Sequence, residues 1–525
     1  MALRIGIDVG GTNTDAVVLD GRRVVAATKS PTTEDVTIGI LSALNQVLQA
    51  VDATEVSAVF IGTTHFINAI AQARGLEPVA VVRLATPPQS LLPMIDWPEH
   101  LQGIVGDNFY VCPGGSQFDG TPLNAVDEVA LRAVAQKIAE SGHRHVALSS
   151  IFSTVNPEPE LLAERILLEE LPGVTVTRSA LVGRVGLLER ENATILNASL
   201  LDLAGRVIDG LEHAVATAGI DAPILLSQND GTVMTLDRAR LFPIFTIASG
   251  PTNSMRGAAL LTGIDDAVVV DVGGTTCDVG LLQRGFPRES TVAMSLAGVR
   301  SNFRIPDVLS FALGGGTIIS DDGQTVGPES VGFRITEKAL LFGGDTLTFS
   351  DIAVAAGATP MGDAARVADV SPETISAAMA IVGARVVHAV EKAMLRADDT
   401  PVIVVGGGGP LLAVVPGLED LVIPENAGVA NAVGAAFAEA GGEVDRVFNL
   451  AGRSRVEVLD QAKAEAIAKA VEAGADPDTV RIVDAEDVPL THLGGGSAVH
   501  VRVKAAGPFA RSAAMTSAAM TSEGN

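Results

Sequence analysis

The chain has 525 residues, too many for one hydrophobic core, so its length predicts several domains. Its formal net charge of −26 argues against a nucleic acid or an anionic membrane as partner, because nothing offsets the repulsion between like charges. The two cysteines exclude a disulfide framework and a four-cysteine zinc site, and they fit a reducing cytoplasm.

The sequence predicts no membrane span and no signal peptide. The mean hydropathy of +0.36 is high, but the longest uncharged run, Thr400 to Leu418, contains prolines and glycines that interrupt a spanning helix. That run predicts a buried strand followed by a glycine turn. A structural strand is expected from Ile5 onward, so no signal peptide is expected before it. We therefore expect a cytoplasmic protein.

Residues 5–19 predict a hairpin that can hold an anion. Gly10 and Gly11 end an apolar strand; they permit a tight turn and let backbone N–H groups crowd against a phosphate. Polar side chains at the same rim come from Thr12, Asn13 and Thr14. Asp8 ends the strand, where a carboxylate beside phosphates requires a cation in between, and this indicates a magnesium nucleotide. A turn-capping aspartate is the alternative.

Residues 24–190 alternate predicted strands and helices, which is typical of an α/β protein. Strands are expected at 24–28, 57–61, 78–84, 145–150 and 174–177, and helices at 35–51, 126–141 and 157–170. Gly62-Thr-Thr-His follows the second of these strands, and Thr63 or Thr64 can cap the next helix. His65 in this motif could face a substrate, although a lone histidine is more often structural.

A second copy of the hairpin occurs at residues 268–282. The pattern D-V-G-G-T-x-x-D recurs with both aspartates 263 positions later, from 8 to 271 and from 15 to 278. Its members are Asp271, Gly273, Gly274, Thr275, Thr276 and Asp278. Asp15 and Asp278 could orient a nucleophile or a magnesium-bound water, or could close their hairpins by hydrogen bonds. Two phosphate hairpins are the pattern of actin, hexokinase and Hsp70-type ATPases, and two unrelated hairpins are the alternative.

A glycine loop near residue 406 is the second candidate nucleotide contact. Helices are expected at 202–218, 252–262, 371–395 and 427–440, and a buried strand at 401–405 leads into Gly406, Gly407, Gly408 and Gly409. These glycines resemble the loop that packs along adenosine in the same ATPases, where a side chain would block the purine. A tight turn is the alternative.

The character of the sequence changes after residue 442. Segments at 456–459, 461–473, 479–484 and 498–503 predict a small β-α-β-β unit, and the last residues are a low-complexity tail that is expected to be disordered. We therefore expect an α/β fold with two RNase H-like halves around a nucleotide cleft. The expected boundaries are 1–190 and 191–442 for the halves, 443–509 for the appendage and 510–525 for the tail.

Further short motifs follow one another in a fixed order. They are Gly62-Thr-Thr64, Gly114-Gly115, Glu189-Arg190 with Asn197-Ala198, Asn229-Asp-Gly231, Ser249-Gly-Pro251, Gly314-Gly-Gly316, Val326-Gly-Pro-Glu-Ser330, Thr348-Phe-Ser-Asp351 and Gly406-Gly-Gly-Gly-Pro410. With the two hairpins, this order resembles the hydantoinase A / 5-oxoprolinase family over about residues 4 to 440. The chain departs from that family at Phe311-Ala-Leu-Gly-Gly-Gly-Thr317, where members usually have Gly-Ala-Gly-Gly-Gly-Ser.

The resemblance implies ATP-dependent ring opening of a cyclic amide, such as a hydantoin or a 5-oxoproline-like lactam, through phosphorylation of the amide oxygen. ATP and Mg²⁺ are the implied cofactors, and Asp307 joins Asp8 and Asp271 as a candidate metal ligand. A neighbouring hydantoinase B-type subunit and an oligomer are also expected. A sugar kinase of the same fold is one alternative, although two cysteines cannot build the cysteine cluster of many such kinases. An actin-like ATPase that remodels a partner protein is the other.

Overall fold

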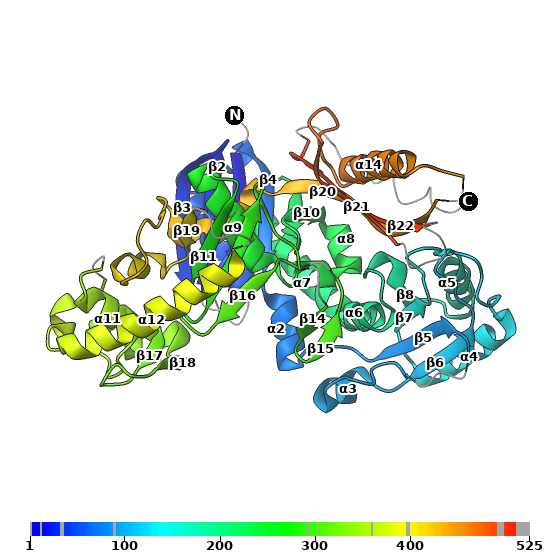
Figure 1. Cartoon of the computed structure of the whole chain (residues 1–525), viewed down its shortest axis with the longest axis horizontal. Coiled ribbons are helices and arrows are strands. Elements are labelled where there is room, and N and C mark those ends of the chain that lie inside the picture. The colour runs from blue at the N-terminus through cyan, green and yellow to red at the C-terminus, as the bar shows by residue number, and fades with distance from the viewer. Residues whose placement is uncertain are drawn as a thin grey trace.

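The computed structural model describes most of the chain and divides it into three large sheets (Figure 1). The described residues are 3–10, 13–31, 36–87, 91–290, 293–303, 305–358, 361–394, 400–450, 452–490 and 498–510. Gly11, Thr12 and the predicted tail after residue 510 lie outside them.

The first half is built on a nine-stranded sheet in the order β21-β22-β20-β10-β9-β4-β1-β2-β3. β1 and β2 form an antiparallel hairpin, and β4 runs parallel to β1. The strands up to β10 are β1 (Leu3–Val9), β2 (Asn13–Asp20), β3 (Arg23–Pro31), β4 (Val56–Thr63), β9 (Ile224–Ser227) and β10 (Thr232–Thr235). Alternate side chains of β1, Ile5 and Ile7 among them, pack against α1 (Val36–Val47) and α7 (Leu201–Thr217).

The second half repeats this arrangement in a five-stranded sheet. β13-β12-β11-β19 have the same order and the same relative directions as β3-β2-β1-β4, and β16 adds to β12. The strands are β11 (Ala267–Val272), β12 (Cys277–Gln283), β13 (Phe286–Pro287), β16 (Val308–Phe311) and β19 (Val402–Val405). The repeat agrees with the duplication that the two sequence hairpins predict.

Helices cover both faces of the second sheet. α12 (Pro372–Ala393) and α11 (Phe349–Ala355) lie on one face, and α9 (Ser249–Thr262) lies on the other. Within the described part of the chain, α12 alone is long and apolar enough to cross a membrane by length and composition. Its Val382 and Val386 are fully buried and pack with Val270 of β11, as expected for a core helix.

A four-stranded parallel sheet, β6-β5-β7-β8, is inserted into the first half. Its elements are β5 (Val79–Ala85), α3 (Glu99–Val105), β6 (Phe109–Pro113), α4 (Glu128–Ser141), β7 (His145–Ser150), α5 (Glu158–Glu170) and β8 (Thr175–Arg178). The next helix, α6 (Leu187–Ser199), is buried along most of its length. Its Glu191 pairs with Arg83 of β5, with Nε 2.9 Å from Oε1, and Arg190 donates to the Ser150 carbonyl at 2.7 Å. Arg190 and Glu191 of α6 therefore hold the inserted sheet to the rest of the protein.

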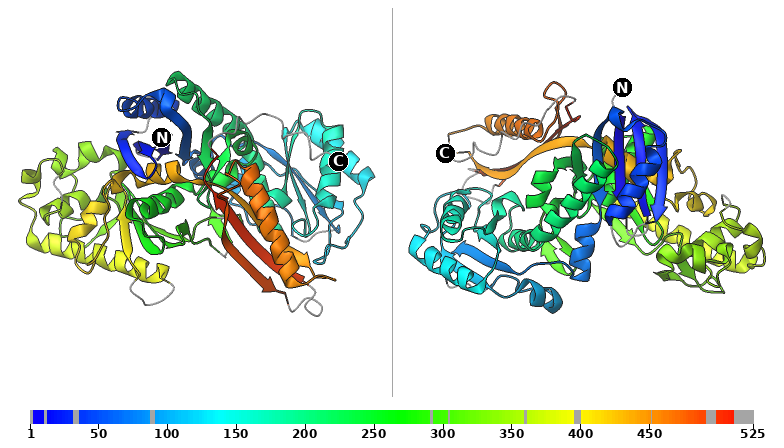
Figure 2. Two further views of the ribbon diagram at one scale, coloured as in Figure 1. Left: turned by 90° about the horizontal axis from the view of Figure 1, so that it is seen from above. Right: turned by 180° about the vertical axis from the view of Figure 1, so that it is seen from behind.

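The predicted appendage is an extension of the first sheet (Figure 2). β20 (Glu439–Asn449) pairs in parallel with β10, β22 (Ala498–Gly507) and β21 (Arg481–Pro489) follow, and α14 (Arg455–Glu472) covers one face. β9 and β10 also belong to this sheet although they come after residue 190. The sheets thus divide the chain differently from the predicted boundaries at 190 and 442, because a strand from far along the chain completes the edge of β10.

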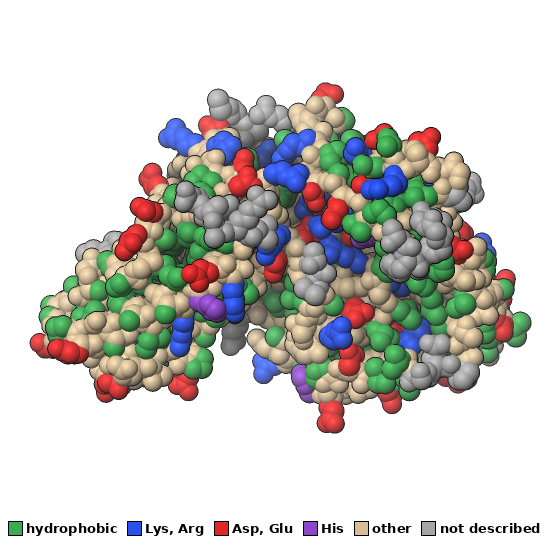
Figure 3. All heavy atoms as spheres, in the orientation of Figure 1, with side chains coloured by type: hydrophobic (Ala, Val, Ile, Leu, Met, Phe, Trp, Pro, Cys, Tyr) green, Lys and Arg blue, Asp and Glu red, His purple; other side chains and the backbone are tan. Residues whose placement is uncertain are grey.

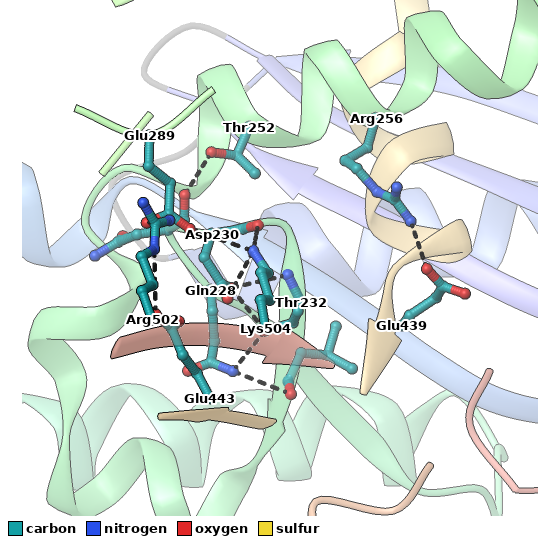
Figure 4. A network of polar contacts seen from close by, with 12 residues as sticks. Gln228, Asp230, Thr232, Thr252, Arg256, Glu289, Glu439, Glu443, Arg502 and Lys504 are labelled. Atoms are coloured by element: carbon teal, nitrogen blue, oxygen red, sulfur yellow. Dashed lines mark hydrogen bonds and ion pairs between the residues drawn. The ribbon is translucent and has the colours of Figure 1, made fainter. Parts of the chain in front are cut away.

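Buried charges anchor β22 to both halves (Figure 4). Lys504 lies 3.0 Å from Oδ2 of Asp230 and 3.4 Å from Oε1 of Glu289, and Arg502 also pairs with Glu289. Asp230, Glu289 and Glu443 have carboxylate oxygens within 4.8 Å of one another, a spacing that could suit a metal ion. Lys504 and Arg502 already supply positive charge to this cluster, so we interpret it as an ion-pair network that fixes the position of β22.

Two helices cross in close contact between the halves. α9 packs against α13 (Ala430–Phe437), and a Cβ atom added at Gly257 or Gly434 would lie well inside 3.0 Å of the other helix's backbone. A Cβ atom at Gly6 of β1 would collide with α13 in the same way. The remaining described elements are α2 (His65–Gln72), α8 (Leu236–Leu241), β14 (Met294–Leu296), β15 (Val299–Ser301), β17 (Thr317–Ile319), β18 (Val326–Ser330) and α10 (Ile335–Lys338).

Candidate functional site

Both predicted hairpins are present, and they have the same register. Asp8 of β1 lies opposite Asp15 of β2, and Asp271 of β11 lies opposite Asp278 of β12. The turns also match, since the Gly10 N–H donates to the Asn13 carbonyl and the Gly273 N–H donates to the Thr276 carbonyl, each at 2.9 Å. The described residues that flank each turn therefore occupy matching positions in the repeated four-strand unit.

The fold brings Asp8 and Asp271 to one place, although they belong to different sheets. The Asn431 amide of α13 donates to Oδ2 of Asp8 at 3.3 Å. The Ser254 hydroxyl of α9 contacts both Asn431 Oδ1 and Asp271 Oδ2. The surface in Figure 3 is hollowed between the part that carries α11 and α12 and the part that carries α2 and α3.

The carboxylates of this site are short of positive charge. Burial, with a further contribution from the charge of Asp15, raises the pKa of Asp8 from 3.8 to about 7. Burial likewise raises the pKa of Asp271 to about 6. Burial also raises the pKa of Asp15, even though Lys29 lies 2.6 Å from its Oδ2, and raises that of Asp278 beside Ser310. A divalent cation would stabilise the ionised form of the carboxylates that it contacts.

Orphaned polar atoms show that the site fits a ligand. Oδ1 of Asp8, both amide atoms of Asn253 and the Ser249 hydroxyl are buried, and within the described residues none has a partner at full hydrogen-bond geometry, although the Asn253 amide lies near enough to Asp8 to lower its pKa. Asp8 Oδ1 and the Asn253 amide both lie close to the point where Gly62 would carry a Cβ atom, which is 2.6 Å from Asp8 Oδ1. Buried polar groups without partners are costly, and oxygen ligands suit magnesium. Asp8 and Asp271 are thus the residues that could hold the metal ion.

The glycine loop after β19 is divided between two roles. The Gly408 N–H donates to the Val272 carbonyl at 2.7 Å, and a Cβ atom at Gly408 would lie 2.8 Å from Val272 Cγ1. A Cβ atom at Gly406 would collide with Asp271, and one at Gly409 would lie 3.1 Å from Val404. Among the described residues, none has an atom within 4 Å of a Cβ added at Gly407. Gly406 and Gly408 therefore pack against the second hairpin and Gly409 against β19, whereas Gly407 faces open space as far as the described residues go.

The glycine run Gly314 to Gly316 supports the turn of the second hairpin, a role that the sequence alone does not indicate. The N–H groups of Gly315 and Gly316 donate to the carbonyls of Gly273 and Gly274 at 3.1 and 2.8 Å. A Cβ atom at Gly314 would collide with the backbone of Thr275. The three consecutive glycines were the available signal, but only the structure shows which backbone they approach.

His65 lies close to the first hairpin. It begins α2, and the preceding Thr64 donates from its N–H and its hydroxyl to the Val9 carbonyl at 3.2 and 3.1 Å. Burial lowers the pKa of His65, which favours the neutral form of its imidazole. The position is compatible with a substrate contact, and a catalytic role for His65 stays a prediction.

Asp307 does not join the other candidate metal ligands. Ser310 of β16 lies opposite Asp278, so Asp307 is three residues further along, roughly 10 Å from the turn end of the hairpin. Its side chain is 42% exposed and lies 2.5 Å from Arg288. The structure does not bring Asp307 to Asp8 and Asp271, because the glycine run that follows it turns back toward the second hairpin while Asp307 remains at the far end of the strand pair. A metal-binding role for Asp307 stays a prediction that this placement does not support.

Comparison with known proteins gives the family. Residues 4–171 match the hydantoinase/oxoprolinase N-terminal region, and residues 190–363 match the hydantoinase/oxoprolinase model. The chain belongs to the hydantoinase/oxoprolinase family. The first match covers the β1–β2 hairpin and the inserted sheet, and the second covers the β11–β12 hairpin.

Two curated relatives and two solved structures are similar to this family member. The caprolactamase subunit alpha of Pseudomonas jessenii is 28% identical over 392 residues, covering 67% of this chain and 54% of that protein. The acetophenone carboxylase gamma subunit of Aromatoleum aromaticum is 26% identical over 399 residues, covering 67% and 53%. The chain thus spans about half the length of the curated relatives it matches.

The structural neighbours confirm the fold. The ATP-dependent caprolactamase of Pseudomonas jessenii superposes with a TM-score of 0.74 at 20% identity, covering 97% of this chain and 88% of that one. Nucleotide-free acetone carboxylase superposes with a TM-score of 0.66 at 17% identity, covering 96% and 88%. With the repeated sheets, these matches confirm the α/β fold of two actin- and hexokinase-like halves that the sequence predicted.

The raised pKa of Asp8 makes stability depend on pH. Between the ordinary pKa of 3.8 and the folded pKa of about 7, the folded protein binds more protons at Asp8 than the unfolded chain does. Unfolding free energy from this group therefore falls as pH rises through that window, by on the order of 4 kcal/mol in total. We expect the melting temperature of the nucleotide-free protein to drop more from pH 5 to pH 7.5 than that of Asp8→Asn. Equal drops in the two proteins would contradict this expectation.

Proposed function

We propose that this chain binds magnesium ATP and uses it to open a cyclic amide. The observation that carries the proposal is the meeting of two equivalent hairpins, with Asp8 and Asp271 joined through α9 and α13. Two glycine turns that could bind an anion, together with two buried carboxylates whose pKa values are raised, suit a metal-bound polyphosphate. The similarity to a caprolactamase subunit supports a cyclic amide as the second reactant.

Each part of the site has a distinct role in this proposal. Asp8 and Asp271 would hold Mg²⁺, the backbone turns at Gly10 and Gly273 would bind phosphate oxygens, and the open side of Gly407 would accept adenosine. Asp15 and Asp278 would orient water or a nucleophile, or would keep the hairpins closed. In this proposal these groups hold the nucleotide and the metal ion in one orientation and stabilise the charge on the phosphates. Such positioning and charge stabilisation are the main contribution of a protein to phosphoryl transfer.

The chemistry explains why ATP is needed. A lactam carbonyl is a weak electrophile with an amine leaving group, so water alone opens the ring slowly. ATP would supply a phosphoryl group to the amide oxygen, which makes the ring carbon a better target for water. Hydantoins, 5-oxoproline-like lactams and caprolactam all present such an oxygen.

A carboxylase is a second candidate function. The acetophenone carboxylase gamma subunit matches the same share of the chain at nearly the same identity as the caprolactamase subunit. A ketone enolate also offers an oxygen that can accept a phosphoryl group, so the same nucleotide site would serve either reaction.

We also propose that the chain works with a second polypeptide in the cytoplasm. Both curated relatives carry subunit names, which supports a hydantoinase B-type or other neighbouring subunit for the hydrolytic step. Cys112 and Cys277 are buried and unpaired, which is compatible with a reducing compartment.

A stimulated ATPase assay tests the proposal. ATP hydrolysis is measured with hydantoin, 5-oxoproline and caprolactam, with acetophenone plus bicarbonate, and with glucose, each with and without the protein encoded next to this one. A linear amide of matched size is the control for each ring. Stimulation by a cyclic amide alone supports ring opening, and stimulation by acetophenone with bicarbonate supports the carboxylase. Stimulation only by glucose or only by a protein partner would refute both.

A further inference from the structure

The two hairpin carboxylates are connected by side chains from the crossing helices. Asn431 of α13 donates its amide to Oδ2 of Asp8 at 3.3 Å. Its Oδ1 contacts the hydroxyl of Ser254 on α9, and that hydroxyl also contacts Oδ2 of Asp271. A continuous path of three polar contacts therefore runs from the first sheet to the second through two side chains.

The backbone around this path is held rigidly. Ser254 is fully buried, and it lies between Gly250 and Gly257 on α9. Gly257 packs directly on the backbone of Ala430, one residue before Asn431. A side chain at Gly257 or Gly434 would collide with the backbone of the other helix, so the close contact that these glycines permit brings the Ser254 hydroxyl beside the Asn431 amide.

The path can also change its bonding without moving the helices. A serine hydroxyl has one hydrogen, so Ser254 donates to Asp271 or to Asn431 at one time, but not to both. When a ligand takes an oxygen of Asp271, Ser254 can turn its hydrogen toward Asn431. The Asp271 carboxylate is then free to contact the ligand, and the Ser254 hydroxyl still donates a hydrogen bond.

We propose that Ser254 and Asn431 are positioning residues that hold Asp8 and Asp271 at one mutual spacing, so that both halves grip the same magnesium nucleotide. The inference rests on the proposed nucleotide site and not on the identity of the cyclic amide. Neither residue has to touch the reacting atoms, since they act through the two aspartates.

A purely structural role for Ser254 is the alternative, and the same helix offers a matched control. Ser254 lies 3.3 Å from the Gly250 carbonyl, four residues earlier. Thr262, also on α9, makes the same type of bond to the Ala258 carbonyl at 2.8 Å. Thr262 lies two turns beyond Ser254 and has no hydrogen bond to the hairpin carboxylates among the described contacts. Thr262→Ala therefore removes the same type of helix bond away from the site, together with the bond that the Ile264 N–H donates to this hydroxyl at 3.2 Å.

The test compares Ser254→Ala, Asn431→Ala, the double variant and Thr262→Ala. Calorimetry measures the binding of a non-hydrolysable ATP analogue as a function of Mg²⁺ concentration, with no amide present, and melting without nucleotide monitors folding. Loss of a side chain that orients a metal ligand typically weakens metal affinity or activity roughly 10- to 100-fold. We expect a loss of this size in the Mg²⁺-dependent affinity for each single variant and a wild-type value for Thr262→Ala.

The double variant separates a shared path from two independent contacts. If both residues act through one path, the fold-loss of affinity in the double variant should be about that of the weaker-binding single variant. If they act independently, it should equal the product of the two single fold-losses. Unchanged Mg²⁺ dependence in both folded single variants, or multiplicative losses, would overturn the inference alone. Failure of the wild-type protein to bind the analogue would instead overturn the proposed function, and this inference with it.

Discussion

Asp8→Asn and Asp271→Asn are each expected to lower ATP hydrolysis by roughly 100- to 1,000-fold while the protein remains folded. The reason is that each change removes a negative oxygen from the shell that would hold Mg²⁺ between the halves. Asparagine has nearly the same shape, and both positions are short of compensating charge, so the substitutions should not destabilise the nucleotide-free protein. Steady-state ATPase rates and melting curves of the purified variants measure the two effects separately.

Asp307→Asn is the matched control for these variants. Asp307 is also an aspartate beside a strand of the second half, but it lies away from the turns and pairs with Arg288. Its replacement should leave the ATPase rate within about twofold of wild type, because surface ion pairs contribute little. Wild-type turnover in both Asp8→Asn and Asp271→Asn would show that the two aspartates only cap their turns.

Gly407→Val should raise the KM for ATP about tenfold or more and leave the melting temperature of the nucleotide-free protein nearly unchanged. A Cβ atom at Gly407 lies more than 4 Å from every described protein atom outside its chain neighbours, so the valine should destabilise the nucleotide-free protein little. In the proposed complex the same space is next to adenosine, and tenfold weaker binding corresponds to about 1.4 kcal/mol. Paired melting curves and ATP titrations measure both quantities.

Gly408→Val provides the comparison within the same loop. Its Cβ atom would lie 2.8 Å from Val272 Cγ1 and 3.0 Å from the Gly273 carbonyl oxygen, so this variant should melt at a clearly lower temperature. If Gly407→Val binds ATP as well as the wild-type protein does, adenosine does not lie beside this loop.

The duplicated fold and both hairpins could be predicted because their signals are local. Asp8 and Asp15 are separated by one turn, and the same pattern recurs at Asp271 and Asp278, so a short window of sequence contains each unit. The strand that leads into Gly406 is also apparent from a single run of apolar residues. The sequence also predicts a helix at 427–440, and the small residues of that segment are what let α13 pack closely on α9.

Features that depend on distant contacts could not be predicted in the same way. Ser254 and Asn431 are 177 positions apart, and no local pattern connects either of them with the hairpin aspartates. The strand order places β20 beside β10 although about two hundred residues separate them, so the sequence suggested an independent unit. Asp307 precedes the glycine run Gly314 to Gly316 in the sequence, which suggests that it lies at the metal site. Its place in space is set instead by the register of β16 on β12.

The proposed function depends most directly on where the nucleotide binds. A structure of the protein with Mg²⁺ and a non-hydrolysable ATP analogue should show the phosphates between the turns at Gly10 and Gly273. The metal ion should lie near Asp8 and Asp271, and the adenosine beside Gly407. A nucleotide bound at another surface, or phosphates held by only one of the two turns, would contradict the account.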